Sequence, residues 1–260
     1  MEPVGLSIGV LGLATRFNEA ISTFNTVQAG RKFGEDVSTC FIKLDAHQLR
    51  LSRWGEAVGL SNIQDTATLN QVFEATRDQR RAEMLLGQVL HLFENAEKTS
   101  KALQGPESIA RDTLFAPDST DSLSRSMKAL AVERQNTAKF KTKAKWALYK
   151  KDQFTELIDD LGSLVKDLEQ LFPATLAKRQ RLAEEEVAQI ATTPEDRTRL
   201  ADIASSPEVG DALLQEAIQK VSGAQTIHNS ATFGANNSGT QIGQIAGSSG
   251  GTWNIGRMQA

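Results

Sequence analysis

The chain has 260 residues, of which 29 are Lys or Arg and 32 are Asp or Glu, for a formal net charge of -3. This mild acidity argues against a dedicated nucleic-acid binder, because neutralising several phosphates requires a clearly cationic surface. A single cysteine, Cys40, excludes an internal disulfide and suits a reducing compartment. The length and the supply of Leu, Val and Ile predict one main domain.

Apolar residues keep helical spacing from about residue 3 to residue 207 and strand patterns are hard to find, so an all-α body is predicted. The first helix is predicted over residues 4–28, and the next two over residues 37–58 and 67–101. The apolar face of the first helix repeats at steps of three and four residues: Leu6, Val10, Leu13, Phe17, Ile21, Phe24 and Val27. The second helix is expected to turn its charged side chains outward: Lys43, Arg50, Arg53 and Glu56.

Three further helices are predicted over residues 122–149, 153–172 and 174–191, and the first of these loses its apolar face toward a lysine-rich end. Two short helices are predicted to start at Thr193-Pro194 and Ser206-Pro207. At both places a hydroxyl can cap free amides and proline fits the first helical position. Their modest apolar content predicts a stalk between the body and the C-terminal tail.

The N-terminal helix is uncharged from residue 3 to residue 15 and carries small residues between its apolar ones. That stretch is shorter than the roughly 20 apolar residues that cross a bilayer. Extending it to residue 27 includes Arg16, Glu19 and Asn25, so burial in the bundle is the default expectation. A helix of this composition could still enter a membrane after release, above all if several copies pair their polar positions.

Residues that could carry catalysis or bind a metal are few. The histidines His47, His91 and His228 have no partners at metal-ligand spacing and are expected at or near the surface. Cys40 lies among apolar positions, which favours a buried structural thiol. The three glutamates at 184–186 are interpreted as a solvated helix face. We therefore expect no enzymatic activity and no catalytic, cofactor or metal site.

Lysines gather between residues 139 and 151, with Trp146 and Tyr149 among them. They could contact anionic lipid headgroups. An ordinary exposed helix end explains the same pattern, and the sequence alone favours this second interpretation. The lysines are Lys139, Lys141, Lys143, Lys145, Lys150 and Lys151.

The tail, residues 223–260, contains no Asp, Glu or Lys and is rich in Gly, Ser, Asn and Gln. A monomeric segment of this composition buries too little apolar area to fold, so disorder is expected. Within it, residues 240–245 form an uncharged, proline-free run that fits cross-β stacking. A flexible linker is the alternative, but aliphatic and aromatic residues placed just before glycine favour the amyloid interpretation.

Four segments, in the same order, resemble the fungal HeLo domain, also called the prion-inhibition-and-propagation domain, of heterokaryon-incompatibility proteins. The most specific of them is the Arg-Leu-Ser-Arg-Trp-Gly-Glu-Ala-Val run of residues 50–58. The segments are Gly30-Arg31-Lys32-Phe33-Gly34-Glu35-Asp36, residues 49–58, residues 92–101, and Lys145-Trp146-Ala147-Leu148-Tyr149. The resemblance covers most of residues 1–191 and implies a helical bundle that executes cell death.

In that family a C-terminal prion-forming region adopts an amyloid fold, often templated by an NLR-type receptor. The helical domain then inserts its N-terminal segment into a membrane and makes it leaky. Carried over, the resemblance implies a membrane-inserting segment that comprises Val4, Leu6, Ile8, Val10, Leu11, Leu13, Phe17, Ile21 and Phe24. Lys32 matches the regulatory loop after that segment, at a position where family members differ in type.

Residues 236–247 resemble the short pseudo-palindromic amyloid motif of other fungal death proteins, whose Gln-Ile-Gly centre is similar to the RHIM core of animal necroptosis proteins. The pair of charged pseudo-repeats that forms a β-solenoid in the incompatibility proteins is missing from this tail. The expected amyloid core comprises Phe233, Asn237, Gly239, Gln241, Ile242, Gly243, Ile245, Gly247, Trp253 and Ile255.

Two domains are thus expected: a helical domain over residues 1–222 and an amyloid-forming region over residues 223–260. The expected function is a cytoplasmic cell-death executor that relocates to the plasma membrane and permeabilises it once its tail is templated. Its expected partners are further copies of itself, an NLR-type receptor and membrane lipids, without nucleic acid or cofactor. The alternatives are a non-lytic regulator or adaptor that joins the amyloid, and a helical adaptor whose tail is merely flexible.

Overall fold

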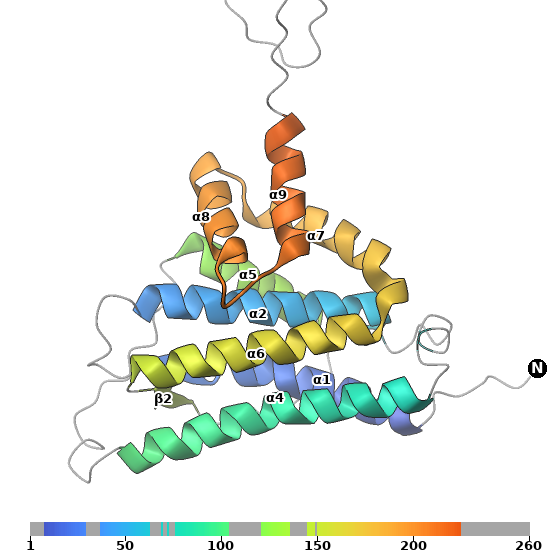
Figure 1. Ribbon diagram of the computed structural model, residues 1–260, viewed down its shortest axis with the longest axis vertical. Coiled ribbons are helices and arrows are strands. Elements are labelled where there is room, and N and C mark those ends of the chain that lie inside the picture. The colour runs from blue at the N-terminus through green and yellow to red at the C-terminus, as the bar shows by residue number, and fades with distance from the viewer. Residues whose placement is uncertain are drawn as a thin grey trace, which may run out of the picture. The chain divides into compact units, whose positions relative to one another are not determined.

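The computed structural model describes residues 8–29, 37–62, 69, 72, 76–103, 121–135, 145–148 and 150–224. The chain divides into one compact unit, Met1–Gln219, and a second unit, Lys220–Ala260. Helices make up most of the described residues of the first unit (Figure 1). The all-α fold class predicted from apolar periodicity is therefore confirmed, with the addition of one small sheet.

The described elements include eight α-helices, one 3-10 helix and two short strands. In chain order they are α1 (Ile8–Phe24), β1 (Val27–Ala29), α2 (Val37–Val58), α4 (Thr76–Leu103), α5 (Ser122–Glu133), β2 (Trp146–Leu148), α6 (Lys151–Leu171), η1 (Pro173–Thr175), α7 (Leu176–Ile190), α8 (Pro194–Ser205) and α9 (Ala212–Ala224).

Helix α2 lies at the centre of the first unit and contacts α1, α5, α6, α7 and α8. In Figure 1, α1 and α6 lie below α2 in the view, and α5 and α7 lie above it. Helix α4 packs against both α1 and α6, so that α1, α2, α4 and α6 enclose the main hydrophobic core. The side chains of Phe17, Trp54, Phe93 and Phe154 are almost fully buried in it.

Helix α6 shows how the sequence pattern produces this packing. Its buried residues recur at steps of three and four, which places them on one face of a helix: Phe154, Leu157, Ile158, Leu161, Val165 and Leu168. Gly162 lies where α6 comes closest to the segment before α9. A Cβ atom there would lie 2.8 Å from the Glu208 carbonyl oxygen, so only glycine lets the segment before α9 approach α6.

The strands β1 and β2 correct two sequence predictions. The first helix ends at Phe24 rather than near residue 28, because Thr26 turns the chain and donates its hydroxyl to the Thr23 carbonyl at 2.7 Å. The helix predicted over residues 122–149 ends at Glu133, and Trp146–Leu148 is a strand. The two strands pair in parallel, with Val27 opposite Trp146 and Ala29 opposite Leu148.

The predicted start of α8 is confirmed, because the Asp196 amide donates to the Thr193 hydroxyl at 3.0 Å and Pro194 is the first helical residue. The second predicted start is wrong. Ser206 ends α8 by donating its hydroxyl to the Ile203 carbonyl, and α9 begins only at Ala212, after Asp211.

The prediction of a stalk is also wrong for the residues of the first unit. Side chains of α8 and of the loop before α9 are buried in that unit rather than exposed on a spacer: Leu200, Ala204, Val209 and Asp211. The segment is therefore part of the folded bundle.

Candidate functional site

The N-terminal helix α1 buries one continuous face in the bundle core. Leu13, Phe17 and Ile21 are completely buried, and Val10 and Phe24 are nearly so. Of the other residues predicted to insert into a membrane, Leu11 is 43% exposed, whereas Val4, Leu6 and the side chain of Ile8 lie outside the described residues. Most of the described apolar side chains of α1 are thus shielded from water.

Aromatic rings fix α1 against its two neighbouring helices. Phe17 meets Trp54 of α2 edge-on at 6.2 Å between ring centroids, and Phe24 meets Phe93 of α4 edge-on at 4.9 Å. Gly55 makes the first of these contacts possible, because a Cβ atom at that position would overlap the ring of Phe17. The Trp54-Gly55 pair inside the most specific resemblance segment therefore has a packing role.

Two glutamine side chains hold the backbone of α1. Gln48, a fully buried residue of α2, donates from Nε2 to the Ile21 carbonyl oxygen at 3.0 Å. Gln135, just after α5, donates from Nε2 to the Asn18 carbonyl oxygen at 3.1 Å and to the Ser22 hydroxyl at 3.0 Å. These three hydrogen bonds hold the C-terminal half of α1 at Asn18, Ile21 and Ser22.

The chain after α1 is tied down by β2. The Trp146 indole Nε1 donates to the Thr26 hydroxyl at 3.0 Å, and the Trp146 amide donates to the Thr26 carbonyl at 2.9 Å. At the outer side of α1, Arg16 pairs with Glu83 of α4 at 3.1 Å. These two side chains are partly exposed, so the pair contributes little to stability in water.

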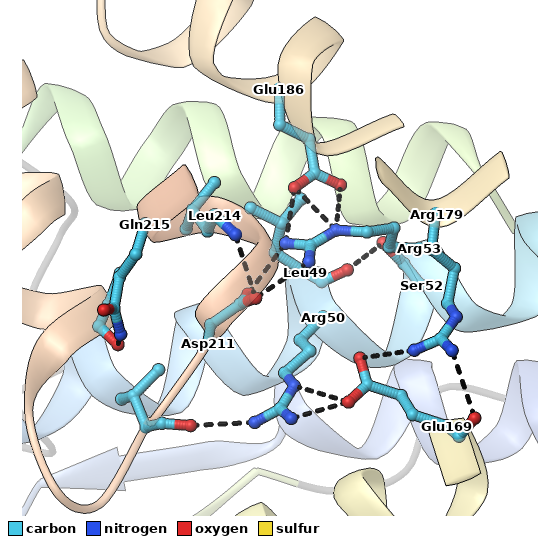
Figure 2. Close-up of polar contacts among 12 residues, drawn as sticks. Leu49, Arg50, Ser52, Arg53, Glu169, Arg179, Glu186, Asp211, Leu214 and Gln215 are labelled. Atoms are coloured by element: carbon cyan, nitrogen blue, oxygen red, sulfur yellow. Dashed lines mark hydrogen bonds and ion pairs between the residues drawn. The ribbon is translucent and has the colours of Figure 1, made fainter. Parts of the chain in front are cut away.

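A buried ion-pair cluster lies on the side of α2 that faces away from α1. The Arg53 guanidinium is completely buried, and it pairs with Glu186 of α7 at 2.6 Å and with Asp211 before α9 at 2.8 Å. Figure 2 shows these two carboxylates approaching it from different sides. Arg134, the residue after α5, donates to the same Glu186 carboxylate. We call these four residues the Arg53 cluster.

Electrostatic compensation keeps Arg53 and Asp211 ionised despite their burial. Burial alone works against the charged form of Arg53, but the Asp211 and Glu186 carboxylates more than offset it and raise its pKa well above the usual value. Burial likewise opposes the ionised form of Asp211, and Arg53 outweighs that effect, so the pKa of Asp211 is about 2. Two positive and two negative groups are thus enclosed together.

A second buried cluster sits beside the first (Figure 2). Arg50 donates to the Glu169 carboxylate of α6 at 2.6 Å and to the Val209 carbonyl oxygen at 2.8 Å. Arg179 of α7 donates to the Glu169 carbonyl oxygen at 3.2 Å and lies 3.5 Å from its carboxylate. This arrangement joins α2, α6, α7 and the loop before α9.

These clusters overturn two expectations. Arg50 and Arg53 do not point outward, and Glu186 is not on a solvated face. Arg50 pairs with Glu169, 119 residues away, and Arg53 pairs with Glu186 and Asp211, 133 and 158 residues away. Lys43 is half-buried and pairs with Glu208 at 2.8 Å, and Glu56 is also half-buried. Leu49, Leu51 and Trp54 could have indicated the burial of the two arginines. A helix segment with apolar residues on both sides of an arginine leaves little of its surface exposed to solvent.

His47 also departs from the sequence expectation. It is completely buried and forms a hydrogen bond between Nε2 and the Glu208 carbonyl at 3.1 Å. Burial, with a smaller effect of nearby Arg50, lowers its pKa to about 4, so it is neutral near pH 7. Cys40 is buried, as expected. In the part of the chain that the structure describes, no three metal-binding side chains come together.

Several predicted site residues lie outside the described residues. They are Lys32, the lysines at 139, 141 and 143, and every residue of the expected amyloid core. Lys145, Lys150 and Lys151 are exposed. Among the described helices, none combines the length and apolar character that crossing a bilayer requires.

A mainly helical bundle that buries the apolar face of its N-terminal helix, followed by a second unit at the C-terminus, defines the class of this protein. The family model for HeLo, described as prion-inhibition and propagation, matches residues 5–197. The chain belongs to the HeLo family.

Relatives and solved structures agree with this assignment. Heterokaryon incompatibility proteins S and s of Podospora anserina are each 32% identical over 235 residues, which cover 88% of this chain and 78% of theirs. The structure of the HET-s N-terminal domain superposes with a TM-score of 0.68 at 30% identity, covering 82% of this chain and 98% of that one. A doubly substituted form of that domain gives a TM-score of 0.67 at 29% identity.

Proposed function

We propose that this protein is an amyloid-triggered executor of heterokaryon-incompatibility-type cell death that permeabilises membranes. The observation that carries the proposal is its 32% identity, over 88% of the chain, to heterokaryon incompatibility protein S. The burial of α1 supports it, because an executor must keep a membrane-active helix away from water until it is triggered.

The membrane step uses the N-terminal segment, from Val4 to about residue 27. The apolar residues that face the core in the stored state are the ones that would face lipid after release. Arg16 and Glu19 make a single copy costly in a bilayer, so insertion needs several copies that pair these polar positions. Lys32, in the loop after this segment, would tune its release.

The trigger is cross-β assembly of residues 223–260, centred on Ile242. In an in-register stack, each Asn or Gln amide bonds to the same amide of the next chain, so one copy gains little and many copies gain much. Assembly also concentrates the bundles of residues 1–222, which favours association of their N-terminal segments. An NLR-type receptor with a similar motif would seed the stack, and the cytoplasmic protein would then move to the plasma membrane.

Dye leakage from anionic liposomes tests this function. The full-length protein is compared before and after addition of preformed fibrils of a peptide spanning residues 223–260. We expect leakage only after seeding, and its loss in Ile242→Asp, whose charge disrupts the stacked core. Ser230→Asp is the matched control, since it adds the same charge outside the expected core and should leak like the unmodified protein.

The second candidate is a non-lytic regulator that joins the amyloid without inserting α1. It stands because the resemblance places Lys32 at a position where members of this family differ in type, and the equal identities to proteins S and s do not favour one type. Seeded fibres without leakage would favour this candidate. A tail peptide that forms no fibres would contradict both candidates.

A further inference from the structure

The two glutamines that hold α1 are fixed in different ways. Gln48 projects from the middle of α2, where the helix backbone sets its position. Gln135 lies beyond the end of α5, in a turn where its own amide donates to the Val132 carbonyl at 3.0 Å. A side chain placed by such a turn depends on the contacts of its immediate neighbours.

The immediate neighbour of Gln135 is Arg134, which belongs to the Arg53 cluster. Its guanidinium is nearly buried, donates to Glu186, and reaches the Ser52 hydroxyl at 3.5 Å. Glu186 is completely buried on α7 and shares its carboxylate between Arg134 and Arg53. The turn that carries Gln135 is therefore anchored through Glu186.

The balance of buried charges also links this turn to Asp211, in the loop before α9. The cluster holds two arginines and two carboxylates, and Arg53 pairs with both Glu186 and Asp211. If Asp211 is withdrawn, two buried guanidinium groups must share the single Glu186 carboxylate. Buried charges without full compensation are strongly unfavourable, so Arg134 and its turn would lose their fixed place.

We propose that Gln135 is a positioning residue that retains α1, and that the Arg53 cluster couples this retention to Asp211. Contacts run without a gap from Asp211 through Arg53, Glu186 and Arg134 to the residue that bonds Asn18 and Ser22. The consequence for release rests on the proposed function, whereas the coupling itself is a property of the soluble fold.

Amide hydrogen exchange in the full-length soluble protein measures the coupling. Glu186→Gln keeps the shape of the side chain but removes its charge. We expect it to speed exchange of the Ser22 amide about tenfold relative to the Leu51 amide of α2, which corresponds to about 1.4 kcal/mol of local opening. Glu169→Gln is the matched control: it removes a buried carboxylate from the Arg50 pair, which does not include Arg134 in the described contacts, and should leave this ratio unchanged.

A double-mutant cycle separates coupling from general loosening. Gln135→Met and Gln48→Met each remove one donor to α1, and each should speed exchange of α1. The effect of Glu186→Gln should shrink to less than half when combined with Gln135→Met, because the contact it acts through is already gone. Combined with Gln48→Met, the two effects should multiply.

Two results would overturn the proposal: equal ratios in Glu186→Gln and Glu169→Gln, or independent effects of Glu186→Gln and Gln135→Met. If Glu186→Gln does not fold, the same cycle is run with Asp211→Asn in its place. Liposome leakage is measured separately on each variant. Coupled exchange without leakage would therefore reject the proposed function alone, and leakage without coupled exchange would reject the inference alone.

Discussion

At the residue scale, Asp45 and His47 lie two positions apart on α2 and are both buried, yet their titrations oppose each other. Burial raises the pKa of Asp45 to about 6, although Lys128 at 3.4 Å and the Ser124 hydroxyl partly offset this effect. Burial lowers the pKa of His47 to about 4. Each group changes charge in the folded protein at a pH different from that in the unfolded chain.

The signs of these two contributions to stability differ. As pH falls from 6.5 to 4, the unfolded chain protonates His47 while the folded protein does not, which removes about 3 kcal/mol of stability. As pH falls from 6 to 3.8, the folded protein protonates Asp45 more readily than the unfolded chain, which adds about 3 kcal/mol. The two effects nearly cancel in the unmodified protein.

Asp45→Asn should expose the contribution of His47. We expect its free energy of unfolding to drop by about 3 kcal/mol more than that of the unmodified protein between pH 7 and pH 4. Urea unfolding at both pH values measures this difference. His47→Gln is the opposite control, which should gain stability on acidification relative to the unmodified protein. Parallel pH profiles for all three proteins would contradict the assignment.

Residue burial was the part of the structure that sequence reasoning predicted least well. The sequence predicts Arg53 and Glu186 at the surface and His47 at or near it, because charged and polar residues are rarely enclosed. The Arg53–Glu186 and His47–Glu208 pairs each join residues more than 100 positions apart, and helical periodicity carries no information about such distant pairs. Cys40 was placed correctly because its apolar neighbours on α2 already decide its side of the helix.

At the element scale, the small parallel sheet closes the end of α1. Trp146 and Thr26 join the strands through their side chains as well as through the backbone. The register places Val27 opposite Trp146, so the strand after α1 and the strand before α6 hold each other. The sheet therefore limits fraying of α1 at its C-terminal end.

A double-mutant cycle with Trp146→Phe and Thr26→Val should measure the contribution of this side-chain hydrogen bond to stability. Each variant removes one partner of the side-chain hydrogen bond, and we expect a coupling energy of about 1 kcal/mol between them in chemical unfolding. Exchange of the Gln28 amide should rise in both variants and no further in the double variant. Strictly additive losses would show that the hydrogen bond contributes nothing and that only packing was lost.

The same sheet explains where element prediction failed. Helix α6 was predicted to within two residues at its start, because its apolar residues mark a single face along its whole length. Residues 146–148 were assigned to a helix because three residues are too few to show an alternating pattern. Their strand conformation depends on Val27–Ala29, about 120 residues earlier, which local sequence cannot reveal.

At the scale of the whole molecule, the loop before α9 completes the bundle electrostatically. Val209 and Asp211 contribute acceptors to Arg50 and Arg53, and Glu208 contributes to Lys43 and His47. The first compact unit accordingly extends to Gln219. The folded domain is thus larger than the helices that surround the hydrophobic core.

Two truncations test this extent. A chain that ends at Ala224 should keep the free energy of unfolding of the full-length protein, because the first unit is intact. A chain that ends at Thr192 should lose at least about 3 to 5 kcal/mol, since Arg53 keeps only one carboxylate in the core. Urea unfolding followed by circular dichroism compares them, with full-length Asp211→Asn as the matched variant. Equal stability of the two truncations would restore the stalk interpretation.

The distance between Arg53 and Asp211 along the chain, 158 residues, has a consequence in time. At about 5 to 20 residues per second, a ribosome needs about 8 to 30 s to make Asp211 after it has made Arg53. Arg53 is synthesised early, but the loop that supplies Asp211 is among the last parts of the domain to be made. A nascent chain therefore carries Arg53 without one of its two carboxylate partners until translation has almost reached the tail.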